Sequence, residues 1–341
     1  MLFRSIHLHT HDTSGIQLAT YLKSIEAGVD VVDVALSSLS GLTSQPNFNT
    51  LVEALRNTKH EVDFNIDSLN DFSNYWEDVR EYYYPFESGL MASTAEVYKH
   101  EIPGGQYSNL KPQAISMGLA DRMNDIKKSY EEVNALFGDI VKVTPSSKVV
   151  GDMAMFMVTQ NLTSEDILKK GDTLSFPESV KSMFKGDLGQ PPGGFPGKLQ
   201  QMILKDEKPY TDLPNAHLTP IDFIAEFDEF QRKYDNYQSF LDFLSFKFYP
   251  KVFDEYYHFK IRHGDVSMIP TPAFFYGMKS NEEILVNIGE GKTLLIRLLY
   301  VGSHIDEEGK RSVYFRLNGQ TRQIEVVDKK AVVKKIGRAH V

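Results

Sequence analysis

The sequence predicts an α/β segment, then a helical region, then a small β-rich domain. Three patterns support this fold class. Two apolar, strand-like runs near the N-terminus enclose a helical pattern, and from Gly118 onward apolar residues recur at the helical period. Beyond Pro272, short β-branched runs alternate with turn residues. At 341 residues the chain is long enough for two or more domains.

The first segment has the pattern strand, helix, strand. Residues 6–12 and 29–36 are the strand-like runs, and Leu18, Leu22 and Ile25 recur at helical spacing within 15–27. Gly28 is placed to end that helix. The three elements therefore predict a βαβ unit, whose two strands are parallel. We also expect helices at 47–57 and 75–84 and a strand at 95–100.

The second region is predicted to be helical. One long helix presents a single apolar face, and shorter helices follow at 149–161, 164–169, 177–184, 199–204 and 221–234. A Gly/Pro-rich loop at 189–196 interrupts them. The residues of the apolar face are Leu119, Met123, Ile126, Tyr130, Val133, Leu136 and Phe137.

The third region is predicted to be a small antiparallel sheet. Its strands are expected at 283–288, 293–302, 312–317 and 320–327. Asn318-Gly319 between the last two is a strong hairpin signal, because a type I′ turn needs two residues at positive φ.

The composition excludes several classes of function. A net charge of −9 argues against a general nucleic-acid or anionic-membrane surface, because both need clustered Lys and Arg. No apolar run approaches the roughly 20 residues of a membrane span. We therefore expect no nucleic-acid partner, no membrane and a cytoplasmic location. Zero cysteines exclude disulfides and thiolate ligands, so a metal site would use His or oxygen donors.

The two ends do not fit the predicted fold. A strand that begins six residues from Met1, without a preceding turn, suggests a chain that starts midway through a domain. Residues 1–5 and 336–341 also resemble translated sequencing-adapter ends. We therefore expect the chain to be a fragment and both tails to be artefacts outside the fold.

The run His7-Leu8-His9-Thr10-His11-Asp12 is the first candidate site. If residues 6–12 are extended, His7, His9 and His11 share one face and Leu8 lies on the other. Two imidazoles two residues apart on a strand can bind one divalent cation. The alternative is a polar strand end whose histidines only form hydrogen bonds, and the run alone leaves both interpretations open.

Taken together and in order, several motifs resemble the carboxyltransferase region of the pyruvate carboxylase family, and the resemblance extends to about residue 330. Related oxaloacetate decarboxylase α subunits and 5S-type transcarboxylase subunits share much of this pattern. The motifs are the histidine run through Gly15, Ser-Gly-Leu-Thr-Ser-Gln-Pro at 40–46, Pro-Phe-Glu-Ser-Gly at 85–89, Glu-Ile-Pro-Gly-Gly-Gln-Tyr at 101–107, Val-Thr-Pro-Ser-Ser-Lys at 143–148 and Gly-Gly-Phe-Pro at 193–196.

The resemblance implies a three-part architecture. Residues 6–117 would be the closing portion of a TIM-type (β/α)8 barrel, and 118–270 a helical funnel. Residues 271–335 would be the small β-rich domain that tethers the biotin carrier and takes part in the contacts of a homotetramer.

The same resemblance implies transfer of a carboxyl group from carboxybiotin to pyruvate, which gives oxaloacetate. His9 and His11 match the paired ligands of a divalent metal, Mn²⁺ or Zn²⁺, whose other ligands have no counterpart in this chain. Thr144 matches the residue that moves a proton between pyruvate and biotin, and Ser147 matches a residue that lines the biotin pocket. The carrier that bears biotin and the domain that uses ATP are absent, so we expect no turnover from this chain alone.

Rival interpretations remain for the motifs and for the whole chain. Outside this context Thr144 to Ser147 would predict only a loop and a helix N-cap, and Gly104-Gly105 a tight turn rather than a phosphate cradle. An oxaloacetate decarboxylase α subunit or a 5S-type transcarboxylase would use similar carboxyltransferase chemistry. A non-enzymatic alternative is a structural or oligomerisation module with vestigial histidines.

Overall fold

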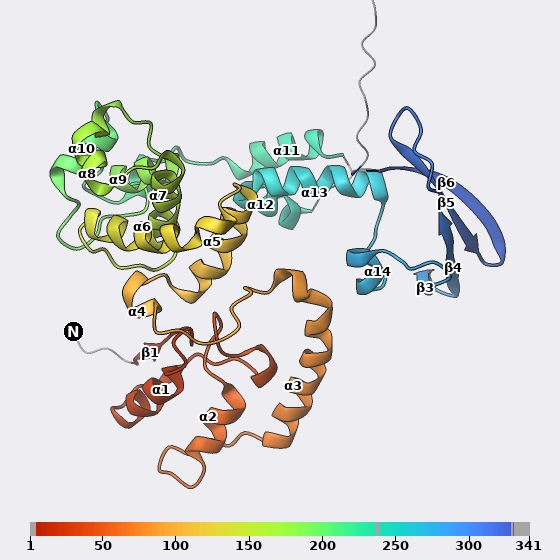
Figure 1. The fold of residues 1–341 in the computed structure, drawn as a ribbon, viewed down its shortest axis with the longest axis horizontal. Helices are drawn as coiled ribbons and strands as arrows, with labels where there is room; N and C mark the ends of the chain where they lie inside the picture. The colour runs from red at the N-terminus through yellow and green to blue at the C-terminus, as the bar shows by residue number, and fades with distance from the viewer. Residues whose placement is uncertain (1–4, 236, 238, 329, 331–341) are drawn as a thin grey trace, which may run out of the picture. The chain divides into compact units, whose positions relative to one another are not determined.

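The computed structural model describes residues 5–235, 237, 239–328 and 330 (Figure 1). The chain divides into two compact units, the first ending at Thr219 and the second beginning at Pro220. Helices are the most frequent elements of the described chain, and its strands form a two-stranded parallel sheet and a four-stranded antiparallel sheet. The expected artefactual ends lie outside the described residues, apart from residue 5.

The N-terminal βαβ unit is confirmed. β1 (His7–Leu8) and β2 (Val31–Val32) pair in parallel, joined by α1 (Gln17–Glu26). Both strands are shorter than predicted, because beyond Leu8 the backbone bonds to loops instead of to β2: the Asp12 amide donates to the Ser44 carbonyl at 2.7 Å. The side chain of Tyr21 on α1 is fully buried and centres the small core beneath this sheet.

The following helices begin at asparagine caps. The side chains of Asn47 and Asn65 accept hydrogen bonds from the amides of Thr50 and Ser68, as expected for N-cap residues. The helix predicted at 47–57 is confirmed, and the one predicted at 75–84 is the end of a longer helix followed by a 3₁₀ segment. The elements are η1 (Ser37–Leu39), α2 (Phe48–Leu55), α3 (Ile66–Arg80) and η2 (Glu81–Phe86).

The strand predicted at 95–100 is wrong, because these residues form the short helix α4 (Val97–His100). Their backbone bonds are local: the amides of Tyr98 and His100 donate to the carbonyls of Ala95 and Glu96. The Thr94 hydroxyl also accepts from the Glu96 amide at 3.1 Å, which starts the turn. The apolar residues of this run therefore sit on a helical turn that ends at Glu101, whose φ of 56° is left-handed.

The main core of the first unit lies among helices. The apolar face predicted from Leu119 onward is confirmed, since Ile126, Tyr130, Val133 and Phe137 are fully buried. The elements around this core are α5 (Gly104–Ser116), η3 (Ala120–Arg122), α6 (Met123–Leu136), α7 (Ser146–Gln160), α8 (Ser164–Lys170), η4 (Gly171–Thr173), α9 (Glu178–Lys185), α10 (Gly197–Leu204) and η5 (Pro214–His217).

The second unit combines an aromatic helical cluster with the antiparallel sheet. Phe230, Tyr234, Phe243 and Phe253 pack together from three helices. The sheet order is β3-β4-β5-β6, and the predicted Asn318-Gly319 turn joins the last two strands. The elements are α11 (Phe223–Lys233), α12 (Phe240–Phe248), α13 (Pro250–His263), α14 (Thr271–Tyr276), β3 (Glu283–Gly289), β4 (Lys292–Val301), β5 (Lys310–Leu317) and β6 (Gln320–Val327).

Among the described residues, no helix combines the length and the apolar composition needed to cross a membrane.

Candidate metal centre and active site

His9 and His11 lie just after β1 and present their Nε2 atoms to each other. These atoms are 3.4 Å apart, and the two rings meet edge to face with centroids 5.1 Å apart. The alternation predicted from the sequence therefore brings this pair together. His7 differs from them, because its Nε2 lies 2.7 Å from Asp33 Oδ1.

The other ring nitrogen of each paired histidine is held by an acceptor. His9 Nδ1 lies 2.7 Å from Asp33 Oδ2, and His11 Nδ1 lies 2.6 Å from the Thr43 carbonyl oxygen. A carbonyl can only accept, and so can an ionised carboxylate, so both Nδ1 atoms donate. In the neutral rings each Nε2 then carries a lone pair, and the two lone pairs face one space.

The carboxyl group of Asp33 is ionised in this arrangement. Hydrogen bonds from His7 and then from His9 stabilise its charged form and hold its pKa below the usual value. A negative acceptor favours the His9 tautomer that leaves Nε2 free for a metal ion.

This donor set fits one half of a metal site. Two nitrogens that bind one ion at about 2.0–2.1 Å and at a tetrahedral angle lie about 3.4 Å apart. Within the described residues, no group of three or more His, Cys, Asp or Glu side chains gathers around a common point. The part of the chain that the structure describes thus supplies two nitrogen ligands, and further ligands would have to come from elsewhere.

Thr144 and Ser147 share a cavity with the paired histidines. The cavity has a volume of about 490 Å³, and all four residues named from the sequence line it. It is also lined by Thr10, Thr13, Ser14, Gln17, Val97, Tyr98, Pro103, Gly104, Gly105, Gln106, Asn109, Lys142 and Val143.

The first turn of α7 positions the two hydroxyl residues. Thr144 is exposed just before the helix, and Ser147 is buried in its first turn. The buried Tyr130 hydroxyl donates to the Ser147 carbonyl at 3.2 Å and so anchors that turn to α6. The helix has no side-chain N-cap. The loop and helix start expected from Thr144 to Ser147 are therefore confirmed, but the expected side-chain cap is wrong, and the Thr144 hydroxyl is not committed to the helix.

Two buried polar atoms in the cavity wall were missed in the sequence. Thr13 Oγ1 and Gln106 Nε2 have no hydrogen-bond partner among the described residues, although both side chains are more than nine-tenths buried. Unpaired buried polar groups are costly and uncommon, so they indicate a missing partner such as a ligand or a water molecule. Sequence offers no signal for them, because Thr13 is covered by the start of α5, and Gln106 lies against Gly151 of α7, only once the chain has folded.

Gly104 and Gly105 begin α5 and do not form the expected tight turn. They let the helix start lie against the histidine loop. A Cβ atom on Gly104 would stand 2.8 Å from His11 Cβ and 2.9 Å from the Thr43 carbonyl oxygen. The absence of a side chain at Gly104 is thus what allows His11 and its carbonyl acceptor to sit under the helix.

Replacing Gly104 by Ala should destabilise the protein and disturb His11. Neither the His11 Cβ nor the Thr43 backbone can rotate away, so the overpacking should cost about 1–3 kcal/mol. Urea unfolding measures the loss. Gly197→Ala is the matched control, since Gly197 also begins a helix and a Cβ there meets nothing within 4 Å. Equal stability of the two variants would contradict this packing role.

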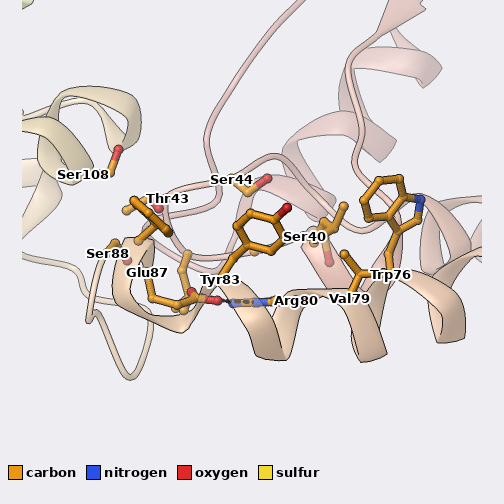
Figure 2. Close-up of a pocket in the computed structure, with 14 residues that line it drawn as sticks. Ser40, Thr43, Ser44, Trp76, Val79, Arg80, Tyr83, Glu87, Ser88 and Ser108 are labelled. Carbon is orange, nitrogen blue, oxygen red and sulfur yellow. Dashed lines mark hydrogen bonds and ion pairs between the residues drawn. The ribbon is translucent and has the colours of Figure 1, made fainter. Parts of the chain in front are cut away.

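A second cavity, of about 540 Å³, lies beside the first and contains neither paired histidine nor Thr144 or Ser147. Figure 2 shows Trp76 and Tyr83 on its wall and the ion pair between Arg80 and Glu87 along its floor. Thr43 lines this cavity, while its carbonyl holds His11 in the other. The candidate site is therefore the histidine cavity.

Comparisons with known proteins agree on one family. A family model described as the conserved carboxylase domain matches residues 97–297. Pyruvate carboxylase of Bacillus subtilis (strain 168) is 49% identical over 323 residues, which is 95% of this chain and 28% of that protein. Pyruvate carboxylase 1 of Caenorhabditis elegans is 45% identical over 328 residues, which is 96% of this chain and 28% of that protein. The chain thus spans just over a quarter of the length of these relatives.

Solved structures give the same result. The carboxyl transferase domain of Rhizobium etli pyruvate carboxylase with pyruvate superposes with a TM-score of 0.86 at 49% identity, covering 95% of this chain and 54% of that one. The structure of that domain with pyruvate and biocytin has a TM-score of 0.85 at 49% identity, with 95% and 55% covered.

Proposed function

Because the chain belongs to the conserved carboxylase domain family and corresponds to the carboxyltransferase region of pyruvate carboxylases, we propose that it transfers a carboxyl group from carboxybiotin to pyruvate. The product would be oxaloacetate. The observation that carries this proposal is the meeting of the paired histidines, Thr144 and Ser147 in one cavity. These residues come from segments more than 130 positions apart in the chain.

His9 and His11 would hold a divalent metal, Mn²⁺ or Zn²⁺, through their Nε2 atoms. Their facing lone pairs and the 3.4 Å separation support this role. When bound, the ion would supply positive charge that stabilises the negative charge developing on the keto oxygen of pyruvate. Asp33 and the Thr43 carbonyl keep both rings in the tautomer that such binding requires.

Thr144 would carry the proton. Its hydroxyl can accept a proton from the methyl group of pyruvate while it donates its own to the ureido nitrogen of biotin. The bond from that nitrogen to the carboxyl group would break first and leave its electron pair on the nitrogen, which then takes the Thr144 proton. The enolate of pyruvate, left by loss of the methyl proton, would form the new carbon–carbon bond to the released carbon dioxide. The exposed hydroxyl, outside the capping bonds of α7, supports this assignment.

The buried polar atoms of the wall would bind the substrates. Gln106 Nε2 is a hydrogen-bond donor without a partner, which suits a carbonyl or carboxylate oxygen. Ser147 would contact biotin near Thr144, and Thr13 Oγ1 offers both a donor and an acceptor. Thr13 and Gln106 would each gain a substrate partner when pyruvate and biotin fill the cavity, and pairing these buried groups would favour the ligands that match them.

At the level of domains, we propose the division given by the family pattern. Residues 6–117 would be late barrel, 118–270 the helical funnel, and the β-rich part from 271 the tether domain with contacts in a homotetramer. Biotin would arrive on a separate carrier and be carboxylated at an ATP-using site elsewhere.

The proposal can be tested in a grafted enzyme, in which residues 6–328 of this chain replace the matching segment of the Bacillus subtilis relative. We expect biotin-dependent oxaloacetate formation from pyruvate, measured by coupling to malate dehydrogenase. The chain alone should give none. A folded, biotinylated graft that hydrolyses ATP but forms no oxaloacetate would contradict the proposed function.

A further inference from the structure

We propose that Asp33 is a positioning residue for the metal site: its carboxylate bridges His7 and His9 and fixes the ring that presents Nε2 to His11. Its two oxygens lie 2.7 Å from His7 Nε2 and 2.7 Å from His9 Nδ1. The inference rests on the proposed function only in taking His9 and His11 as metal ligands.

The register of the parallel strands places Asp33 beside His9. His7 pairs with Val31 and Leu8 with Val32. Asp33, which directly follows β2, therefore stands next to His9, which directly follows β1. The Asp33 amide donates to the Leu8 carbonyl at 3.2 Å, which continues this alignment past the last paired residues. Neighbouring residues on aligned strands point to the same face, and the carboxylate therefore reaches the imidazoles.

His7 has a defined role in this arrangement. The Asp33 side chain is 39% exposed, and a carboxylate that bonds only His9 could rotate in solvent. Because its second oxygen is held by His7, rotation would break two hydrogen bonds instead of one. His7 therefore stabilises the carboxylate that orients a ligand, without reaching the metal position itself.

The buried hydroxyl of Tyr21 holds the backbone beneath this network. It donates to the Asp33 carbonyl at 2.7 Å and accepts from the Thr10 amide at 3.2 Å. Tyr21 thus connects the backbone of Thr10, which follows His9, to the backbone of Asp33. Its ring is fully buried in the small core, so this connection is rigid.

The two ligands are supported differently. His9 is held by a charged carboxylate, whereas His11 is held by the neutral carbonyl of Thr43. Hydrogen-bond partners of this kind fix the orientation and tautomer of a ligating imidazole, and their removal typically weakens metal binding by about 10- to 100-fold. Loss of Asp33 should therefore act on metal affinity through His9.

The test is a Co²⁺ titration of the metal-free grafted enzyme, followed by visible absorption. We expect Asp33→Ala to weaken Co²⁺ binding about 10- to 100-fold and to change the absorption bands. Asp33→Asn should have a smaller effect, because one acceptor oxygen remains. His7→Phe should weaken binding less than Asp33→Ala, since the His9 contact survives.

Asp30→Ala is the matched control. Asp30 lies three residues before Asp33 and accepts from the Ile6 amide at 2.8 Å, so it supports the strand without touching an imidazole. The Co²⁺ affinity of the Asp30→Ala variant should stay within about twofold of the parent value. This change is far smaller than the roughly 10- to 100-fold weakening expected when a partner of a ligand is lost. Equal weakening in both variants, together with lower unfolding midpoints, would mean that Asp33 is only structural and would overturn the inference.

His9→Ala in the same titration separates the two proposals. If it loses Co²⁺ while Asp33→Ala binds like the parent, the positioning role of Asp33 fails and the ligand assignment stands. If His9→Ala binds like the parent, the ligand assignment itself fails.

Discussion

Replacing His9 or His11 by Ala in the grafted enzyme should abolish both metal binding and oxaloacetate formation. Each variant removes one of two Nε2 donors that lie 3.4 Å apart, and a single imidazole cannot hold the ion in the same geometry. Carboxyl transfer should fall by several orders of magnitude. Metal content by plasma mass spectrometry and oxaloacetate formation by coupled assay measure the two losses on the same samples.

Biotin carboxylation provides the internal control for these variants. In the proposed enzyme it takes place at a separate ATP site, so biotin-dependent ATP hydrolysis should survive. His263→Ala is the external control, since His263 is exposed at the end of α13 and should change neither quantity. Oxaloacetate synthesis at a near-normal rate in both His9→Ala and His11→Ala would show that the ligand assignment is wrong.

Replacing Thr144 by Ala should abolish carboxyl transfer while metal content stays normal. The change removes the hydroxyl that would take the proton from pyruvate and pass one to biotin, and loss of such a group typically costs about 10²- to 10⁴-fold in rate. Because Thr144 is exposed and outside the capping bonds of α7, the fold should be unaffected. Rate and metal content, measured together, separate this effect from that of the histidine variants.

Thr144→Ser tests the chemical reason. It keeps a hydroxyl at the same position and should retain a substantial part of the rate. Thr159→Ala removes a hydroxyl from the other end of α7, where it donates to the Met155 carbonyl, and should leave the rate unchanged. Equal loss in the Ala and Ser variants at position 144 would argue against a proton-transfer role.

Local patterns predicted much of the fold. The βαβ unit, the apolar face of α6 and the Asn318-Gly319 hairpin each depend on residues close in sequence, and each is confirmed. The run at 95–100 was mistaken for a strand because its apolar residues also suit a helical turn. Two features favour the helical turn: the Thr94 hydroxyl accepts from the Glu96 amide, and no strand among the described residues lies in position to pair with this run. Neither feature appears in a periodicity pattern.

The candidate site was only partly visible in the sequence. The spacing of His9 and His11 is enough to bring their rings together, since alternation along an extended chain needs no tertiary information. Asp33 could have been found by aligning the two predicted strands in parallel, because that register places it beside His9. Gln106 could not, since its burial follows from the packing of α5 on α7, where its Nε2 lies against Gly151.

The partners of the paired histidines have a consequence for the order in which the site assembles. The acceptors of His9 and His11 lie only 24 and 32 residues away in the chain, within the first βαβ unit and the loop after it. Contacts of short sequence separation form early, because closing a short loop costs little entropy. During synthesis the paired imidazoles can therefore be set in place before Thr144 has left the ribosome, and the hydroxyl proposed to carry the proton would join them later.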